Sequence, residues 1–350
     1  MVSFIYEQGS EVDTTGDILF AHVKPHITTM MLATNYQPDQ AIREASFTRK
    51  DFWQLKNGEI SYLASNTLEV YLKVSDHLLK PSQALRQIHQ INESTVLTAR
   101  ILLGLWSVRR HNSTVSKDGR VAMLLEEILQ WQGIQKHSRT ARTGATKRYT
   151  DGYRAEQKRR VIRDIALLAS CTIRGTCSIV AGGKTTSTRI DDPYLHYSTI
   201  SRKTDTGEEA VTGFLVAPGN WITTYEQHKN SSLAQVNKRI FTLNPQNDRY
   251  ALRFALYLTE RWREQAIHGT FDTPITMSEL LCASMIEVDE RHFTSRFIPK
   301  IEKALLQLEE MKIIGKQQRL TSLDATQTRW GRAWLTSSWE ILPPLELMHV

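Results

Sequence analysis

A run of glycine, lysine and threonine at residues 181–186, AGGKTT, is the first candidate for chemistry in this sequence. The end of a nucleotide-binding P-loop has this form, because backbone amides and a lysine hold the phosphates there. That motif also requires a glycine at the position of Ser178, and a helix after Lys184, where TTSTRIDDPY has no helical pattern. We therefore expect a glycine turn between two strands, from which Lys184 can contact a phosphate, and no nucleotide hydrolysis.

Asp191 and Asp192, with His196 nearby, are the next candidates, since paired carboxylates are ligands for hard cations. Adjacent aspartates point apart in a strand, and they also cluster before prolines in turns, as they do before Pro193. We expect a turn here and no bound metal ion.

The nucleophilic side chains show no catalytic arrangement. A relaxase or recombinase needs a tyrosine nucleophile with paired histidines or a basic cluster, and the sequence has no His-x-His pair. Tyr149 and Tyr153 lie near arginines, which a DNA-binding surface predicts equally well. Cys171, Cys177 and Cys282 form no CxxC pair and are expected to be buried free thiols. The prediction is a protein that is not an enzyme and uses no cofactor.

Positive charge is the stronger signal, in a chain with a net charge of +7. Residues 136–163 contain ten lysines and arginines and few acids. These cations are Lys136, Arg139, Arg142, Lys147, Arg148, Arg154, Lys158, Arg159, Arg160 and Arg163. Interleaved with Ser, Thr, Gly and Tyr, they suit contacts to phosphates, so double-stranded DNA is the expected partner. A solvated loop or a protein-binding surface is the alternative.

Helical periodicity assigns this basic cluster to a series of elements. One helix starts at a cap formed by Ser94 or Thr95 and ends before residue 109, and a second helix covers residues 120–131. Residues 135–151 have no periodicity, and a long third helix begins near Asp151. Strands are expected at 172–181, 195–200 and 211–216, the last two joined by a hairpin-type loop with Arg202 and Lys203 beside it.

The C-terminal part of the chain repeats this order. A helix at 249–267 precedes a short helix at 276–284, where Thr276 and Glu279 have capping-box spacing. A turn at 291–297 leads to a main helix from Ile298, then to an extended segment at residues 313–314 before Gly315. The stretch 334–342 is expected to form an outer wing strand. Cations roughly 100° from the apolar side of the main helix, or in the turn before it, are candidates for phosphate contacts: Arg291, Arg296, Lys300 and Lys303.

Three helices with a short middle one, followed by strands, have the layout of a winged-helix module. The predicted fold is α+β and helix-rich, with tandem winged-helix modules at 91–220 and 246–345. A linker at 221–245 joins them, and residues 1–90 form an N-terminal extension of unknown role. Alternating runs and the turn signal Asn57-Gly58 predict some strand in this extension.

Composition limits the class of protein. With 350 residues, of which 41% are hydrophobic, the chain can form two or three packed domains. No stretch approaches the roughly 18 apolar residues that span a bilayer, and the first residues lack the pattern of a signal peptide. We expect a folded, soluble, cytoplasmic protein with no membrane partner.

The pair of modules resembles the tandem winged-helix replication initiators of bacterial plasmids. The resemblance covers Ser94 to Val216 and Asn244 to Leu342, and it includes the helix-to-strand junction RFIPKIEKALLQLEEMKIIG at residues 296–315. It implies binding to repeated origin sequences as a monomer, a dimeric form that regulates, and recruitment of host replication proteins. A transcriptional regulator or partition adaptor, and a DNA-processing enzyme such as a relaxase or recombinase, stay open as alternatives.

The basic cluster is expected to divide its work between two kinds of DNA contact. Cations outside any regular element should contact phosphates and position the duplex: Arg139, Arg142, Lys147 and Arg148. Cations on the third helix are held on a fixed axis and should recognise base edges: Arg154, Lys158, Arg159 and Arg163.

Overall fold

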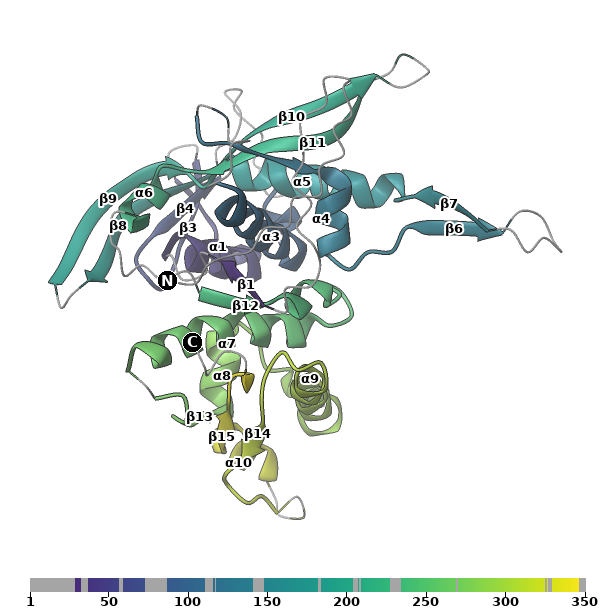
Figure 1. Cartoon of the computed structure of the whole chain (residues 1–350). Helices are drawn as coiled ribbons and strands as arrows, with labels where there is room; N and C mark the ends of the chain where they lie inside the picture. Colours follow the sequence, from purple (N-terminus) through teal and green to yellow (C-terminus); the bar gives the residue numbers. More distant parts are fainter. Residues whose placement is uncertain are drawn as a thin grey trace.

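The computed structural model consists of helices packed against antiparallel sheets (Figure 1). It describes residues 29–32, 37–56, 59–72, 87–110, 116, 118–140, 148–181, 184–203, 207, 209–226, 234–268, 270–324, 326 and 329–345. Buried apolar side chains of residues 91–220, here called the first unit, and 246–345, the second unit, belong to one hydrophobic core. The α+β class predicted from the sequence is confirmed.

The first unit is built around a helix that is buried on nearly every side. This helix, α3 (Glu93–Arg109), begins after Asn92, whose side chain accepts a hydrogen bond from the backbone N–H of Ser94. A helix that is apolar all round belongs in a core. The elements that follow α3 are β5 (Val121–Leu124), α4 (Leu125–Trp131), β6 (His137–Thr140), β7 (Arg148–Gly152), α5 (Ala155–Ser170), β8 (Cys171–Ala181), β9 (Lys184–Pro193), β10 (Leu195–Lys203) and β11 (Glu209–Pro218). Strand β11 pairs with both β10 and β5.

The second unit repeats part of this order with shorter strands: it lacks counterparts of the hairpins β6–β7 and β8–β9 and has an additional short helix before its last strand. Its elements are α7 (Arg249–His268), β13 (Ile275–Thr276), α8 (Met277–Ala283), the helical turns η3 (Glu290–His292) and η4 (Phe293–Phe297), α9 (Ile298–Glu310), β14 (Gln317–Arg319), α10 (Trp330–Thr336) and β15 (Ser338–Ile341). Strand β15 pairs with both β13 and β14. In each unit a first helix is followed along the chain by a strand, a short helix and a long helix. In the three-stranded sheet of each unit, the last strand in sequence lies between the other two.

Local sequence signals explain the helices of the second unit. Thr276 caps α8 in the predicted capping box with Glu279. Pro299 lies in the first turn of α9, where its missing N–H leaves no hydrogen bond unmade. One side of α9 is buried in the core, as the spacing of its apolar residues predicted. These predictions are confirmed.

The strands of the second unit differ from the prediction. Ile313 and Ile314 are buried in a turn, and the strand begins only at Gln317. The predicted outer strand, β15, is the middle strand of its sheet, and Trp334 lies in the helix before it. At Gly315 a Cβ atom would come within 2.4 Å of the carbonyl oxygen of Pro343. A glycine is needed here because the two chain segments approach so closely.

Three elements of the first unit also differ from the prediction. Residues 121–124 of the expected second helix form β5, because their pairing with β11 stabilises the extended conformation more than helical propensity favours a helix. The segment without periodicity contains the hairpin β6–β7, and α5 begins at Ala155, after Asp151. Asn92, and neither Ser94 nor Thr95, occupies the N-cap position of α3.

The N-terminal segment is part of the first unit's structure. It contributes α1 (Gln37–Phe47), the helical turn η1 (Lys50–Phe52), and the strands β2 (Gln54–Lys56), β3 (Glu59–Leu63) and β4 (Glu69–Leu72). These strands form a five-stranded sheet, β2-β3-β4-β8-β9, with β8 (Cys171–Ala181) and β9 (Lys184–Pro193). The expected turn at Asp191-Asp192 is wrong, because both residues lie in β9.

The predicted linker contains regular structure and is partly buried. It includes α6 (Trp221–Glu226), β12 (Ala234–Asn237) and the helical turn η2 (Lys238–Thr242), and β12 pairs with β1 (Thr29–Leu32). The ring of Trp221 stacks on Tyr194 with centroids 5.7 Å apart. Residues 221–226 and 234–242 are therefore part of the folded structure, where the sequence predicted a linker.

Candidate nucleic-acid interface

Three hairpins project from the body of the first unit: β6–β7, β8–β9 and β10–β11 (Figure 1). Arg139 and Arg148 lie in the first of these hairpins, in antiparallel register, so the expectation that they lie outside regular structure is wrong. Arg142 and Lys147 lie outside the described residues. Arg202 and Lys203 lie at the end of β10 with exposed side chains, and Lys184 begins β9.

Two lysines of the basic cluster, Lys136 and Lys158, lie near the carboxylate of Glu126. Lys136 forms an ion pair with Glu126 at 2.9 Å, and Lys158 lies 3.9 Å from the other oxygen of this carboxylate. The hydrogen bond to Glu126 raises the pKa of Lys136, which also lies over the ring of Tyr153. These side chains are half exposed, and exposed ion pairs contribute little to stability, so a phosphate can replace the carboxylate.

The arginines of α5 lie on other parts of the helix. Arg154 is exposed at the N-cap, where its backbone N–H donates to the side chain of Gln157 at 2.9 Å. Arg159 and Arg163 are exposed and Arg160 is half-buried. Of these four arginines, Arg154 lies at the N-terminus of α5 and the other three lie further along the helix.

Asp164 fixes α5 against α3 from the buried side. Its carboxylate accepts a hydrogen bond from Ser94 Oγ at 2.6 Å and is close to the hydroxyl groups of Thr95 and Thr98. Burial raises the pKa of Asp164, although Ser94 and the nearby Arg163 oppose this effect. The sequence identified Asp164 only as a charge within the basic cluster, because its partners are distant in the chain.

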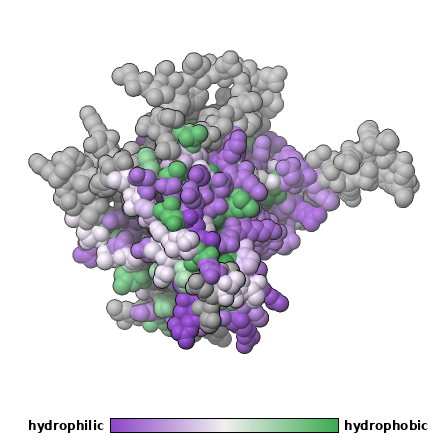
Figure 2. Space-filling view, turned by 90° about the horizontal axis from the view of Figure 1, so that it is seen from below, coloured by the Kyte–Doolittle hydropathy of each residue, from purple (hydrophilic) through white to green (hydrophobic). Residues whose placement is uncertain are grey.

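Lys300 and Lys303 of α9 are exposed, as the helical spacing predicted, and so is Arg296 in the preceding turn η4. Arg291 is exposed in the preceding turn η3. Gln307, in the last part of α9, donates from Nε2 to Oδ1 of Asp248 at 3.0 Å. Asp248 is the residue just before the start of α7. Seen from the side of the second unit, the described surface is mostly hydrophilic, with hydrophobic residues in scattered patches (Figure 2).

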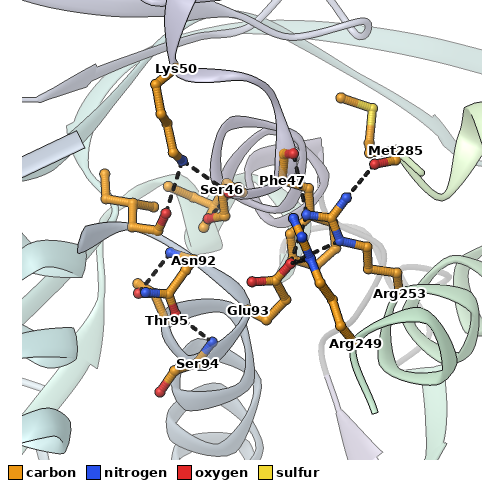
Figure 3. A network of polar contacts seen from close by, with 12 residues as sticks. Ser46, Phe47, Lys50, Asn92, Glu93, Ser94, Thr95, Arg249, Arg253 and Met285 are labelled. Atoms are coloured by element: carbon orange, nitrogen blue, oxygen red, sulfur yellow. Dashed lines mark hydrogen bonds and ion pairs between the residues drawn. The ribbon is translucent and has the colours of Figure 1, made fainter. Parts of the chain in front are cut away.

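A buried ionic junction connects the two units, and the sequence gave no signal for it. Glu93 at the start of α3 accepts from Arg249 and from Arg253 of α7, each at 2.6 Å (Figure 3). Arg253 also donates to the backbone carbonyls of Phe47 and Met285. Although burial disfavours the charged form of Glu93, Arg253 and Arg249 hold its pKa below the usual value.

A second group of buried charges lies where α1, α3 and α7 meet. Glu260 of α7 binds Arg43 of α1 at 2.9 Å and Arg100 of α3 at 2.7 Å. Arg100 also approaches Asp39, which accepts a hydrogen bond from the hydroxyl of Tyr194 at 2.7 Å. Burial raises the pKa of Asp39 from 3.8 to about 6, against the opposing effect of Arg100.

Lys184 and the three cysteines are among the candidates for chemistry, and the structure shows the surroundings of each. The residues that follow Lys184 form a strand, where a P-loop requires a helix. Cys171 and Cys177 are buried, and burial raises the pKa of Cys171 to about 12, while Cys282 is exposed, contrary to expectation. Within the described ranges no group of three or more His, Cys, Asp or Glu side chains could hold a metal ion. No helix in these ranges is long and apolar enough to cross a membrane.

No protein-family model matches this chain, and neither a curated protein nor a solved structure was found that is similar to it.

Proposed function

We propose that this chain is a sequence-specific double-stranded DNA-binding protein with two winged-helix modules, and that it acts as an initiator of plasmid replication. The observation that carries the proposal is the repeated order of elements: β5, α4, α5, β10 and β11 in the first unit correspond to β13, α8, α9, β14 and β15 in the second. In this correspondence α5 and α9 are the recognition helices, and β10–β11 and β14–β15 are the wings.

The exposed charges support DNA as the partner. Both candidate recognition helices carry exposed cations on the side that faces away from the core. Phosphate contacts from such cations supply non-specific affinity, and a helix in the major groove adds base recognition. We propose that the protein binds DNA without chemistry of its own.

The initiator role is supported by the resemblance of the layout to plasmid replication initiators. The same resemblance extends the proposal to a regulatory homodimer, to host replication proteins as partners, and to the cytoplasm as the location. Arrays of repeated sites are typical targets of such proteins, whereas a regulator needs only a promoter site.

Footprinting on the DNA that flanks the protein's own gene tests this proposal. We expect several protected repeats, no strand cleavage, and support of replication of an origin-less plasmid when the gene and its repeats are supplied together. A single protected promoter site would favour a transcriptional regulator. Strand cleavage would favour a DNA-processing enzyme, and the absence of salt-dependent duplex binding would contradict a DNA-binding function.

A further inference from the structure

A groove of about 1000 Å³ lies between the two units, along the exposed side of α5. Helix α5 contributes Arg159, Arg160 and Arg163 to its walls, the start of α3 contributes Glu93, and the corner that leads into α7 contributes Arg249. Small-molecule pockets are lined mostly by apolar and aromatic side chains, and this groove has no aromatic side chain in its lining. Its lining instead suits a polar, anionic ligand.

The positive charges in the groove are only partly neutralised. The guanidinium groups of Arg159 and Arg160 form no hydrogen bond with any residue that the structure describes. They also form no ion pair within 4 Å with these residues. Glu93, in contrast, is already bound by Arg249 and Arg253. Glu156 is the other acidic side chain in the lining, and it is exposed in the first turn of α5. An anion would therefore meet arginines whose donors are unused.

Arg249 reaches the same groove from the second unit. Its side chain is 54% exposed, and its Nε donates to Glu93. Both terminal nitrogens of Arg249 lack hydrogen bonds to the described part of the chain, so they can donate to an oxyanion. The neighbouring Asp248 contacts Gln307 of α9. The groove is thus lined by α5 on one side and by residues 245, 246 and 249 on the other, and Asp248, beside these residues in the chain, contacts α9.

We propose that this groove holds the phosphodiester backbone of a duplex, with Arg159 and Arg160 contacting it from one unit and Arg249 from the other. The inference rests on the proposed DNA-binding function and adds a third contact region to it. The planar guanidinium group of an arginine can donate two parallel hydrogen bonds to the oxygens of one phosphate. Arg159 and Arg163 then position the backbone, in place of the base recognition that the sequence predicted for them, and Arg154 remains the candidate for a base.

Salt-dependent binding of the full chain to a random-sequence duplex tests the groove. The variant Arg159→Gln with Arg160→Gln removes two cations, and we expect the slope of log K against log salt to flatten by about one unit for each arginine. Arg159→Lys with Arg160→Lys keeps the charge and should retain the slope. Arg189→Gln, an exposed arginine on β9, is the control for loss of charge elsewhere and should also leave the slope unchanged. Equal thermal unfolding midpoints establish that all variants fold.

The outcomes separate this inference from the proposed function. If the wild type does not bind the duplex, the DNA-binding function fails and the inference fails with it. If the wild type binds with a steep salt dependence and the glutamine variant keeps the full slope, the groove is not a backbone site, while the proposed function stands. Stabilisation of the wild type by inorganic pyrophosphate, lost in the glutamine variant without any change in the duplex slope, would assign the groove to a small free anion and overturn the inference.

Discussion

The first and second units share an order of helices and strands but use charged side chains differently. In the first unit, α5 turns Arg159 and Arg163 outward and keeps one acid, Asp164, inside against α3. In the second unit, α7 buries Arg253 and Glu260 in contacts with the first unit and with α1. The exposed cations of the second unit that the sequence singled out lie on α9 and in the turn before it.

This difference separates charges that hold the molecule together from charges that are available to a partner. A buried charge is costly unless it is paired, so losing one partner should affect folding strongly. An exposed cation contributes little to stability, so its loss should change binding and leave folding intact. Loss of a buried charge partner should therefore have a larger effect on the protein than loss of an exposed charge.

Glu260→Gln should have the largest effect. The change leaves Arg43 and Arg100 without the carboxylate that lies 2.9 Å and 2.7 Å from them, and breaking a buried pair costs about 3–5 kcal/mol. Urea unfolding of the full chain measures the loss. Glu287→Gln, at an exposed ion pair with Arg49, is the control and should cause no measurable change. A loss below about 1 kcal/mol for Glu260→Gln would mean that the buried charges where α1, α3 and α7 meet do not stabilise the fold.

Asp39→Asn should change the pH dependence of stability. Because burial raises the pKa of Asp39 from 3.8 to about 6, the folded protein binds this proton more tightly than the unfolded chain does. The contribution of Asp39 to stability is therefore greatest at low pH and falls as pH rises from about 4 to about 6. Arg100, Tyr194 and Glu260 are the groups that act on Asp39 in addition to burial.

Unfolding measurements across this pH range check the sign. At 1.36 kcal/mol per pKa unit, the difference in stability between wild type and the Asp39→Asn variant should change by about 2 kcal/mol over this range, and by about 3 kcal/mol over the full titration from about pH 2 to about pH 8. If the free energies of unfolding of the two proteins change with pH in parallel, the carboxyl of Asp39 does not titrate as its burial implies.

Arg154→Ala should reduce specificity without affecting folding. Arg154 is exposed at the N-terminus of α5, so a contact from it to a base edge would be worth about 1–3 kcal/mol of discrimination. Binding to the protected site and to random DNA, measured at the same salt concentration, should therefore differ less in the variant. Arg189→Ala is the matched control. Equal losses of affinity for both DNAs would place Arg154 among the residues that contact phosphate.

Glu156→Gln should have the smallest effect, and it should strengthen DNA binding. Removing the exposed acid from the lining of the groove relieves repulsion of a phosphate, for a gain of about two- to fivefold in duplex affinity. Glu59→Gln, which removes an acid from β3, should not change affinity. Weaker duplex binding by the Glu156→Gln variant would argue against a phosphate in the groove.

The sequence by itself determined the elements whose signals are local. The cap at Thr276, the first turn at Pro299 and the apolar spacing of α9 each act within a few residues, so α7, α8 and α9 were predicted nearly to their ends, whereas α10 was not predicted. The hairpin β10–β11 was predicted for the same reason. The exposure of the α9 cations followed from helical geometry alone.

Only the tertiary structure decided how distant segments combine. Residues 121–124 are a strand because β11 pairs with them, and residues 54–72 join a sheet with β8, which no periodicity within either segment reveals. The groove is lined by both Arg159 and Arg249, and the junction brings Glu93 to Arg253, across long separations in the chain. The side chains that line the site depend on contacts between the units, because charge and periodicity along a chain do not specify which faces meet.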